Sequence, residues 1–387
     1  MATEKVLHLF DITASGEQVP LAEVGQCDAP FTFAHVDSPP LNLPAPIFLN
    51  RPEFAKVFPN GPVARYPQMI CAVENCFLMG PFGFVVLPQG QLIRQSAVNL
   101  DGASMEFSLG HYKGQLPGTH LPWAQAPATV FAANSYSTNN YFHFLTDAFA
   151  QLHWRDRLPA AGDAKVIVSG FPPHAEATMP FVGAAMNVLG LPAGTLQPYD
   201  GTLLFCRKLI FPRRDTGMSP WKAQFLRRCF GVEGRTRTKD GRQTSGSQIG
   251  GKQRLYIARG AAPRRRVLNE AAVEHLLKGH GFVAVNPGAL SLVEQVKLFA
   301  DAEIVAGPHG AGLTNAIFMA PGGAVVELTH HERVVWTYHE VAGAGGHAYA
   351  SVIADSQGDS EEPLFADFSV DLEALDAAVK AAIAAVK

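Results

Sequence analysis

The sequence predicts an α/β protein in which two regions of alternating strands and helices follow a strand-rich start. From Tyr141 onward the apolar residues recur with a helical period, and the buried-strand run Lys165–Ser169 follows. From Arg254 to about Ile353 strands and helices alternate again, and such alternation predicts parallel sheets. Residues 1 to about 130 carry short apolar runs, such as Phe82–Leu87, between turn signals, which is typical of short strands and hairpins.

The first alternating region continues to Phe230. In order, we expect a helix within Ala175–Leu189, strands over Leu203–Cys206 and Lys208–Phe211, and a helix over Trp221–Phe230. Residues 232–252 then consist largely of Gly, Ser, Thr, Arg, Lys and Gln, with almost no apolar side chains. That composition predicts a loop or linker, and a solvated surface loop is favoured over a lid near the phosphate site described below.

The second alternating region is followed by a C-terminal helix. In order, we expect a strand over Tyr256–Arg259, a helix over Ala271–Lys278, a strand over Gly281–Val285, a helix over Leu290–Ala300 and a final helix over Leu372–Val386. Ser291 stands three residues before Glu294, which is the spacing of a capping box. This spacing predicts that Ser291 caps the start of the helix.

The glycine-rich turn Gly307–Asn315, which reads Gly-Pro-His-Gly-Ala-Gly-Leu-Thr-Asn, is the most informative motif. A buried-strand run, Glu303–Ala306, leads into it, a short apolar helix over Ala316–Met319 follows, and another strand is expected over Ala324–Leu328. Glycines at such a turn let the backbone approach a ligand, and the start of a helix offers unpaired N–H groups to an anion. His309 adds a donor that can carry charge. We therefore expect a phosphate or diphosphate here, with tight packing alone as the competing explanation.

Composition limits the partners that the chain can have. Its 387 residues suffice for two domains with cores of their own. Charged residues make up 17% and the formal net charge is −3, so we expect no nucleic-acid partner and no attraction to an anionic membrane. Attraction for phosphate must therefore be local. Basic residues do gather ahead of the glycine turn: Arg207, Lys208, Arg213, Arg214, Arg227, Arg228, Arg235, Arg237, Arg254, Arg259 and Arg264–Arg266.

Targeting signals and cysteine usage favour the cytoplasm. No apolar run approaches the length of a membrane span, and the N-terminal segment lacks the apolar core of a secretory signal. The five cysteines include no Cys-x-x-Cys, which favours reduced thiols over a disulfide framework or a structural zinc site. We therefore expect a cytoplasmic protein without a membrane span.

The glycine turn and its surroundings resemble the C-terminal signature of glycosyltransferase family 61. His-Gly-Ala-Gly-Leu-Thr-Asn is followed by Phe318, Pro321-Gly322 and Val326-Glu327-Leu328. Upstream stand Arg259 after a strand, an arginine triplet before Asn269-Glu270, and a helix with Glu294-Gln295. The resemblance runs from about Arg254 to Leu328. The segment Asn139–Asp147, with an aromatic-His pair ahead of an Asp, is also similar to the N-terminal motif of the family.

The resemblance implies a GT-B-like fold, with two Rossmann-like domains facing across a cleft. We expect an acceptor-side domain over residues 1–205 with a strand-rich start, a nucleotide-sugar-binding domain over 206–370 and a C-terminal helix over 371–387. The implied reaction is inverting transfer of a sugar from a nucleotide-diphosphate donor, expected to be a UDP-sugar, to a glycan or a lipid-linked saccharide. Eukaryotic members are secretory-pathway proteins, so this chain is expected to be a bacterial, cytosolic member. No cofactor is expected beside the nucleotide-sugar donor.

The resemblance also implies residue roles. The chain lacks the Asp-x-Asp string that holds a metal in many glycosyltransferases, so arginines and a helix N-terminus are expected to stabilise the leaving diphosphate. The donor-binding candidates are Arg259, Arg266, His309, Gly310, Ala311, Gly312, Asn315 and Glu327, with Arg264 and Arg265 as alternatives within the triplet. Glu327 is expected to contact ribose hydroxyls, and Asn315 to orient the turn. The base for the acceptor hydroxyl is expected to be Asp147 or His143, four residues apart on one helix face.

Several alternatives compete with this interpretation. His-Gly-Ala-Gly also resembles the oxyanion-hole turn of lipase-like hydrolases, but the Gly-x-Ser-x-Gly elbow that these need is absent. A metal site from His330, His331, Glu332 and His339 is disfavoured because adjacent side chains point apart, and surface histidines are favoured instead. A non-catalytic homologue could bind nucleotide sugar or glycan without turnover. Ordinary local hydrogen bonding competes as the role of Asn315, Glu327, His143 and Asp147.

Overall fold

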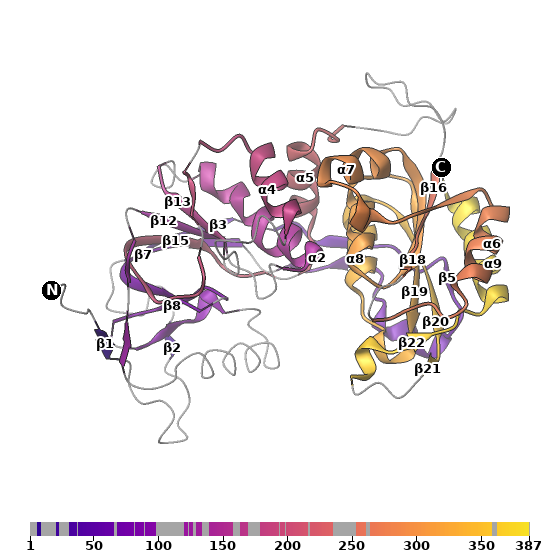
Figure 1. Cartoon of the computed structure of the whole chain (residues 1–387), viewed down its shortest axis with the longest axis horizontal. Coiled ribbons are helices and arrows are strands. Elements are labelled where there is room, and N and C mark those ends of the chain that lie inside the picture. Colours follow the sequence, from indigo (N-terminus) through magenta and orange to yellow (C-terminus); the bar gives the residue numbers. More distant parts are fainter. Residues whose placement is uncertain are drawn as a thin grey trace. The chain divides into compact units, whose positions relative to one another are not determined.

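In the computed structural model the chain divides into two compact units (Figure 1). Unit 1 comprises Met1–Ser38 and Tyr66–Gly217, and unit 2 comprises Pro39–Arg65 and Met218–Lys387. The structure describes the chain except for residues 1–5, 9–20, 23–30, 37, 66–67, 81, 89, 98–119, 123, 127–128, 134–138, 158–162, 169–178, 193, 198, 216, 235–252, 261–263, 358–361 and 387. The loop expected at 232–252 therefore lies outside the described residues from 235 onward.

The division between the units falls between Gly217 and Met218, after the boundary expected at residues 205/206. The expected boundary lies inside a single strand. β15, Leu204–Pro212, runs through the two short strands that the sequence predicted separately. It pairs antiparallel with β7, Gln68–Met79, so a cut there would break the sheet of unit 1. Unit 2 includes Pro39–Arg65 because β5, Phe48–Leu49, extends its sheet beside β20, Ala348–Ala354.

Unit 1 is built on a mixed sheet of ten strands. The path is β14-β13-β12-β15-β7-β8-β9-β2, with β11 beside β15 and β3 beside β7. The other bounds are β2 Leu21–Ala22, β3 Phe31–Val36, β8 Phe84–Val86, β9 Leu92–Ile93, β11 Ala124–Gln125, β12 Val130–Ala133, β13 Lys165–Val168 and β14 Leu196–Gln197; β1 Val6–His8 pairs separately with β10 His120–Pro122. Strands β12 to β15 are parallel, as predicted for the alternating region.

A helical segment connects β12 to β13 in unit 1. It comprises α2, Tyr141–His143, a π-helical turn η3, Phe144–Ala148, and a 3-10 segment η4, Phe149–Arg157. The Asn140 side chain caps its start by accepting the Phe142 N–H at 2.9 Å. A π turn within a helix often marks a functional site, and this one contains Asp147. After β13 comes α4, Pro180–Val188, and the start expected for this helix, at residue 175, lies outside the described residues.

Unit 2 is built around a parallel six-stranded sheet of order β17-β16-β18-β19-β20-β5. The strands are β16 Gln253–Ile257, β17 Phe282–Val285, β18 Ala302–Pro308 and β19 Ala324–His330, besides β20 and β5. In Figure 1, α6, Glu270–Gly279, and α9, Leu372–Ala385, cover one face, whereas α7, Leu292–Ala300, and α8, Thr337–Gly345, cover the other. Every residue of β18 and β19 is buried, so these central strands form the core with the helices.

Short elements complete unit 2. They are β4 Leu41–Leu43 paired with β6 Gly61–Val63, β21 Ser356–Gln357 paired with β22 Asp367–Phe368, α5 Pro220–Cys229, and the 3-10 turns η1 Pro52–Val57, η6 Pro287–Ala289, η7 Ala311–Phe318, η8 His331–Arg333 and η9 Pro363–Phe365; unit 1 has η2 Arg94–Ser96. The capping box of Ser291 and Glu294 at the start of α7 is confirmed. The helix after the glycine turn, η7, begins earlier than predicted, because the Leu313 N–H already donates to the Gly310 carbonyl at 3.0 Å.

In both sheets the strand order reverses at one point. In unit 2 the chain runs from β16 outward to β17 and then returns past β16 to β18, β19 and β20. In unit 1, β13 and β14 lie on one side of β12 and β15 lies on the other. Ligands of open α/β sheets bind beyond the carboxyl ends of the strands at such a reversal. The fold therefore directs attention to the ends of β16 and β18, and of β12 and β15.

Candidate active site

His309, directly after β18, is buried within a chain of hydrogen-bonded side chains. Its Nδ1 contacts Glu327 Oε1, and Glu327 Oε2 accepts the Tyr349 hydroxyl at 2.5 Å. Both oxygens of Glu327, a residue only 1% exposed, are thus engaged, which corrects the expectation that Glu327 contacts ribose hydroxyls. Burial lowers the pKa of His309, and Glu327 opposes this change without reversing it. His309 is therefore a neutral imidazole that donates to Glu327.

Three guanidinium groups surround His309. Arg259 Nη1 and Arg265 Nη1 donate to the His309 carbonyl oxygen at 3.3 and 2.8 Å, and Arg333 Nε lies 3.4 Å from His309 Nε2. Within the described ranges, none of the three forms an ion pair with a carboxylate, and Nε of both Arg259 and Arg265 is buried without a hydrogen-bond partner. Burial, followed by the like charges of Arg259 and Arg333, lowers the pKa of Arg265 to about 10. An anion at this point would relieve the repulsion and accept the unused N–H groups.

Only the middle arginine of the triplet faces this cluster. Arg265 has a backbone φ of 54°, a left-handed conformation that costs a non-glycine residue roughly 1 kcal/mol or more and that turns its side chain toward His309. Arg264 stacks on the Phe365 ring at 4.3 Å, and Arg266 forms an ion pair with Asp367 at 2.6 Å. The sequence favoured Arg266, and the structure corrects this by bringing Arg265 to the turn.

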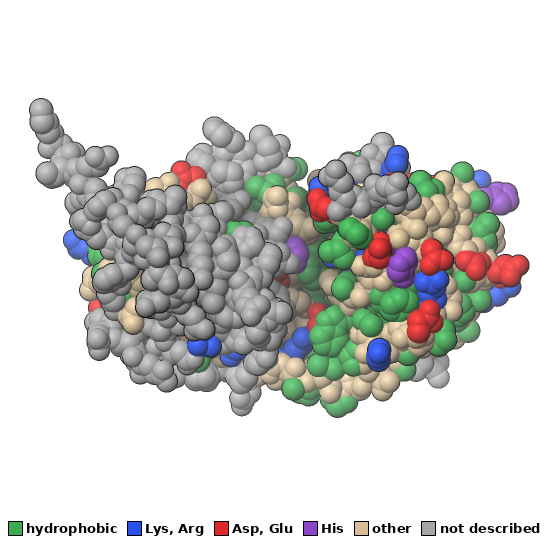
Figure 2. All heavy atoms as spheres, turned by 90° about the horizontal axis from the view of Figure 1, so that it is seen from below, with side chains coloured by type: hydrophobic (Ala, Val, Ile, Leu, Met, Phe, Trp, Pro, Cys, Tyr) green, Lys and Arg blue, Asp and Glu red, His purple; other side chains and the backbone are tan. Residues whose placement is uncertain are grey.

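The positive charge around His309 is a local feature. Among the side chains coloured in Figure 2, acidic and basic groups are interspersed and do not gather into a patch of one sign. This pattern agrees with a formal net charge of −3 for the whole chain. The three guanidinium groups around His309 are therefore a local concentration of positive charge at the strand reversal.

The glycines of the turn make room for neighbouring atoms. A Cβ at Gly307 would lie 2.9 Å from Ile257 Cβ, and one at Gly312 would lie 3.1 Å from Ile257 Cγ2, because β16 packs directly against the turn. A Cβ at Gly310 would collide with Arg259 Nη1. Close packing thus accounts for Gly307 and Gly312, whereas Gly310 keeps open the space that the Arg259 guanidinium occupies. Ala311 is half-buried and begins η7.

Two buried hydrogen-bonding side chains hold the turn and the end of β16. Asn315 Nδ2 donates to Gln295 Oε1 at 2.9 Å and to the Gly312 carbonyl at 3.1 Å, and Asn315 is fully buried, so it orients the turn without reaching a ligand. Glu270 accepts the backbone N–H of Arg259 at 2.9 Å, which fixes where this arginine leaves the strand. Gln295 and Glu270 were not predicted as functional residues from the sequence. A polar residue on the buried face of an amphipathic helix was the available signal for Gln295.

In unit 1 the helical segment after β12 brings His143 and Asp147 together. His143 Nδ1 lies 2.7 Å from Asp147 Oδ2, and Thr146 Oγ1 donates to Asp147 Oδ1 at 2.9 Å. The Asp147 side chain is 4% exposed and the His143 side chain is 21% exposed, so the histidine is the more accessible of the two. The expected i, i+4 pairing is confirmed. A carboxylate on Nδ1 favours the tautomer with its proton on Nδ1 and its lone pair on Nε2.

Arg214 stands beside this pair, two residues after β15. It is 4% exposed, and in the part of the chain that the structure describes its Nε, Nη1 and Nη2 have no hydrogen-bond partner. Its guanidinium carbon lies 5.5 Å from the centre of the Phe84 ring. Burial lowers the pKa of Arg214 to about 9, and the Asp147 carboxylate opposes that change. Arg214 was not predicted as a functional residue from the sequence, although its place just after an expected strand was a usable signal.

Comparison with known families decides what these residues belong to. Residues 141–326 match the model of the family described as Glycosyltransferase 61. Residues 141–326 form a glycosyltransferase family 61 domain. The match spans the His143–Asp147 pair, Arg214, Arg259 and His309, and no curated protein matches the chain. This glycosyltransferase therefore carries its candidate residues at the strand reversals of both units.

The histidines considered for a metal site have separate surroundings in this glycosyltransferase. His330 and His339 are both 0% exposed, so the expectation of surface histidines is wrong for these two, which end or cover buried strands. His339 Nε2 lies 2.6 Å from the Pro44 carbonyl oxygen, and His331 Nδ1 lies 3.7 Å from Asp355. Among the described residues, no group of three or more His, Cys, Asp or Glu side chains could hold a metal ion. In the same part of the chain, no helix combines the length and apolarity of a membrane span.

Proposed function

We propose that this enzyme is an inverting, metal-independent glycosyltransferase that takes its sugar from a nucleotide-diphosphate donor. In this proposal the two units are the halves of a GT-B arrangement: unit 2 binds the donor, and unit 1 supplies the base for the acceptor. The observation that carries it is the cluster of Arg259, Arg265 and Arg333 around the glycine turn. None of the three guanidinium groups has a carboxylate partner among the described residues, and their place at a strand reversal suits a strongly anionic group.

The leaving diphosphate gains negative charge as the bond to the sugar breaks. Preorganised cationic donors stabilise that charge most when they are already held in place and partly removed from water. Arg259 is held through its backbone by Glu270, and the Arg265 backbone is held by its N–H, which donates to the Phe365 carbonyl at 3.1 Å. Neutral His309, clamped between Glu327 and Arg333, positions the carbonyl on which the two arginines converge. Arginines can thus do here what a bound metal ion does in other transferases.

Inversion requires the acceptor oxygen to attack the anomeric carbon from the side opposite the diphosphate. We assign His143 as the base, because its side chain is more accessible than that of Asp147. The acceptor oxygen forms the new bond to the anomeric carbon, the bond from that carbon to the diphosphate oxygen breaks, and the hydroxyl proton moves to His143 Nε2. Asp147 holds the Nδ1–H and stabilises the imidazolium that forms, as a buried carboxylate does for catalytic histidines elsewhere. The buried Arg214 guanidinium is a counter-charge beside the Asp147 carboxylate.

We further propose a UDP-sugar as donor, a glycan or lipid-linked saccharide as acceptor, and the cytoplasm as the compartment. The test is transfer from a panel of nucleotide sugars to saccharide acceptors in the presence of EDTA, with the anomeric configuration of the product read by NMR. We expect one donor to give a product of inverted configuration at an unchanged rate in EDTA. Retained configuration would refute the mechanism, and loss of activity in EDTA would refute metal independence. Binding of a nucleotide sugar with neither transfer nor hydrolysis would favour the non-catalytic alternative.

A further inference from the structure

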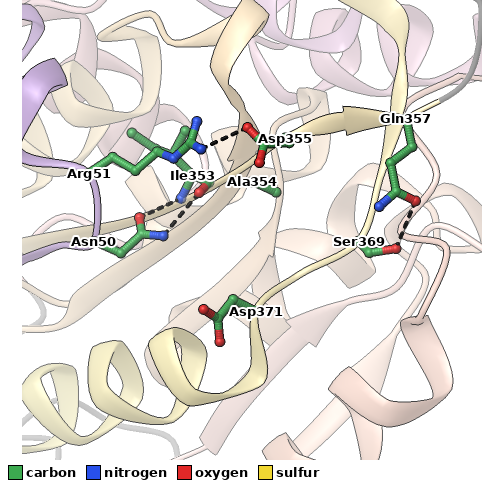
Figure 3. Close-up of a pocket in the computed structure, with 8 residues that line it drawn as sticks. All are labelled: Asn50, Arg51, Ile353, Ala354, Asp355, Gln357, Ser369 and Asp371. Atoms are coloured by element: carbon green, nitrogen blue, oxygen red, sulfur yellow. Dashed lines mark hydrogen bonds and ion pairs between the residues drawn. The ribbon is translucent and has the colours of Figure 1, made fainter.

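Unit 2 contains a polar cavity of about 220 Å³ beyond the carboxyl end of β20. Three segments line it: Arg51 follows β5, Asp355 and Gln357 follow β20, and Ser369 and Asp371 precede α9. Figure 3 shows these side chains around the cavity, with Arg51 and Asp355 joined on one side and Gln357 and Ser369 on another. The cavity is smaller than the roughly 300–1,000 Å³ of pockets that hold drug-sized ligands, so it suits a single ring.

The chemistry of the lining selects a ligand with hydroxyl groups. Arg51 Nη2 donates to Asp355 Oδ1 at 2.7 Å, and Ser369 Oγ donates to Gln357 Oε1 at 3.1 Å. Asp371 Oδ1 caps α9 by accepting the Glu373 N–H at 2.9 Å. One guanidinium and two carboxylates give the lining a formal charge of −1, which disfavours a phosphate. The carboxylates accept O–H groups, and the Gln357 amide offers N–H donors, so a neutral polyhydroxylated ring is complementary.

A single short turn links this cavity to the arginine cluster. η8 follows β19, and Arg333 at its end reaches His309 Nε2 at 3.4 Å. His331 at its start lies 3.7 Å from Asp355 in the cavity. The two features also share one edge of the parallel sheet, because β19 separates β18, which leads to His309, from β20, which leads to Asp355. Two strand spacings amount to about 10 Å, a span that one nucleotide sugar can bridge.

His330 provides a second, independent observation between the two features. The side chain is 0% exposed, and neither ring nitrogen has a hydrogen-bond partner among the described residues. The centre of its ring lies 5.7 Å from that of Phe368, the residue that precedes Ser369. Its register partner across the sheet is Ala354, which lines the cavity. A buried imidazole without partners is costly, so His330 marks unsatisfied polar groups directly beside the lining of the cavity.

We propose that this cavity binds the hydroxylated ring of the donor that adjoins the diphosphate, which is the ribose or the transferred sugar. The inference rests on the proposed diphosphate site at Arg259, Arg265 and Arg333 and adds the residues that recognise the donor ring. It also replaces Glu327, whose oxygens are occupied by His309 and Tyr349, as the source of carboxylates for ring hydroxyls.

The test compares three probes by calorimetry on the full chain. Inorganic pyrophosphate has no ring, a nucleoside diphosphate adds the ribose, and the corresponding nucleotide sugar adds the sugar ring. The nucleoside diphosphate used is whichever of UDP, GDP, ADP and CDP binds the wild type most tightly. The double variant Asp355→Ala/Gln357→Ala removes a carboxylate and an amide from the lining. We expect it to raise the Kd of a ring-bearing probe about tenfold, as loss of two hydrogen bonds predicts, and to leave the Kd of pyrophosphate unchanged. Weakening already seen with the nucleoside diphosphate assigns the ribose, and weakening confined to the nucleotide sugar assigns the transferred sugar.

Matched variants separate this inference from the proposed function. Asp371→Asn keeps an N-cap side chain of equal quality and should weaken the same ring-bearing probe, whereas Asp376→Asn removes a carboxylate of α9 outside the cavity and should weaken none. Arg265→Ala should weaken pyrophosphate and nucleotides alike. If the double variant and Asp371→Asn both bind every probe as the wild type does, the cavity assignment is overturned while the diphosphate site stands. If the wild type binds none of the probes, both proposals fail.

Discussion

Replacement of Arg214 by methionine is expected to stabilise the protein and to slow sugar transfer. Arg214 is a buried cation whose three guanidinium nitrogens lack hydrogen-bond partners in the described chain. A methionine fills similar space, packs against Phe84, and removes the charge. Such a substitution removes a cost of folding, but it also removes the counter-charge of Asp147, the carboxylate that holds His143.

The magnitude follows from the pKa of Arg214, which burial lowers from 12.5 to about 9. That difference corresponds to roughly 5 kcal/mol against the charged form in the folded state. Loss of the contact with Phe84 and of the attraction to Asp147 offsets part of it. We therefore expect the free energy of unfolding to rise by about 1–4 kcal/mol at pH 7, the usual range when an apolar side chain replaces buried charge.

The pKa of Arg214 also fixes how the stability gain of Arg214→Met changes with pH. A cation with a lower pKa in the folded than in the unfolded chain destabilises the fold wherever it is charged. The cost is complete below about pH 9 and disappears as the pH rises from about 9 toward 12.5. The stability advantage of Arg214→Met should therefore be largest near pH 7 and should shrink above pH 9.

Urea denaturation at pH 7 and pH 10, with transfer assays on the same samples, tests this reasoning. Arg213→Met is the matched control, because Arg213 is only half-buried on the same segment and should bring no such gain. Donor affinity of Arg214→Met should equal that of the wild type, while transfer should fall at least about tenfold. A variant less stable than the wild type at pH 7 would refute the account of Arg214 as an unpaired buried charge. Normal transfer would refute its part in the reaction.

Two further predictions concern the base and the glycine turn. His143→Ala and Asp147→Asn should both bind donor normally and lose transfer activity. The transfer rate of His143→Ala should fall by on the order of 10²–10⁴, and that of Asp147→Asn should fall less, because the asparagine removes only the carboxylate that orients and charges the histidine. Single-turnover assays measure these rates, and a normal rate for His143→Ala would place the base elsewhere. Gly310→Ala should fold but bind nucleoside diphosphate at least several-fold more weakly, because the new Cβ displaces the Arg259 guanidinium. Gly307→Ala should instead lower the melting temperature, because its Cβ meets Ile257 at 2.9 Å. Thermal melts and calorimetry test both variants, and wild-type nucleotide affinity in Gly310→Ala would contradict the prediction.

Local patterns in the sequence were sufficient to predict most elements of unit 2. The capping box of Ser291 and Glu294, the buried runs of β18 and β19, and the i, i+4 spacing of His143 and Asp147 all act within a few residues, so the structure reproduces them. The domain boundary shows the limit of such reasoning. Residues 204–212 form one strand because β7 pairs along it, and that partner lies far away in the sequence.

The side chains of the site depended on contacts that the sequence does not contain. Arg265 rather than Arg266 meets His309 because of a single left-handed φ, and no residue type at that position announces it. Glu327 was expected at a ligand, yet Tyr349 on the neighbouring strand and His309 occupy its oxygens. Arg333 lies after the glycine turn, outside the basic residues that gather before it, and only the parallel pairing of β18 and β19 brings it to His309.

The affinity of the arginine cluster for nucleoside diphosphate tests the central claim most directly. Calorimetric Kd values should be measured for the wild type, Arg265→Ala and Arg266→Ala with UDP, or with whichever of GDP, ADP and CDP binds more tightly. Loss of a charge-assisted hydrogen bond, worth about 1.5–3 kcal/mol, should weaken binding to Arg265→Ala by roughly 10- to 150-fold. Arg266→Ala should bind as the wild type does, because Arg266 is paired with Asp367 away from the turn. Wild-type affinity in Arg265→Ala, or a loss confined to Arg266→Ala, would contradict the assignment of the donor site.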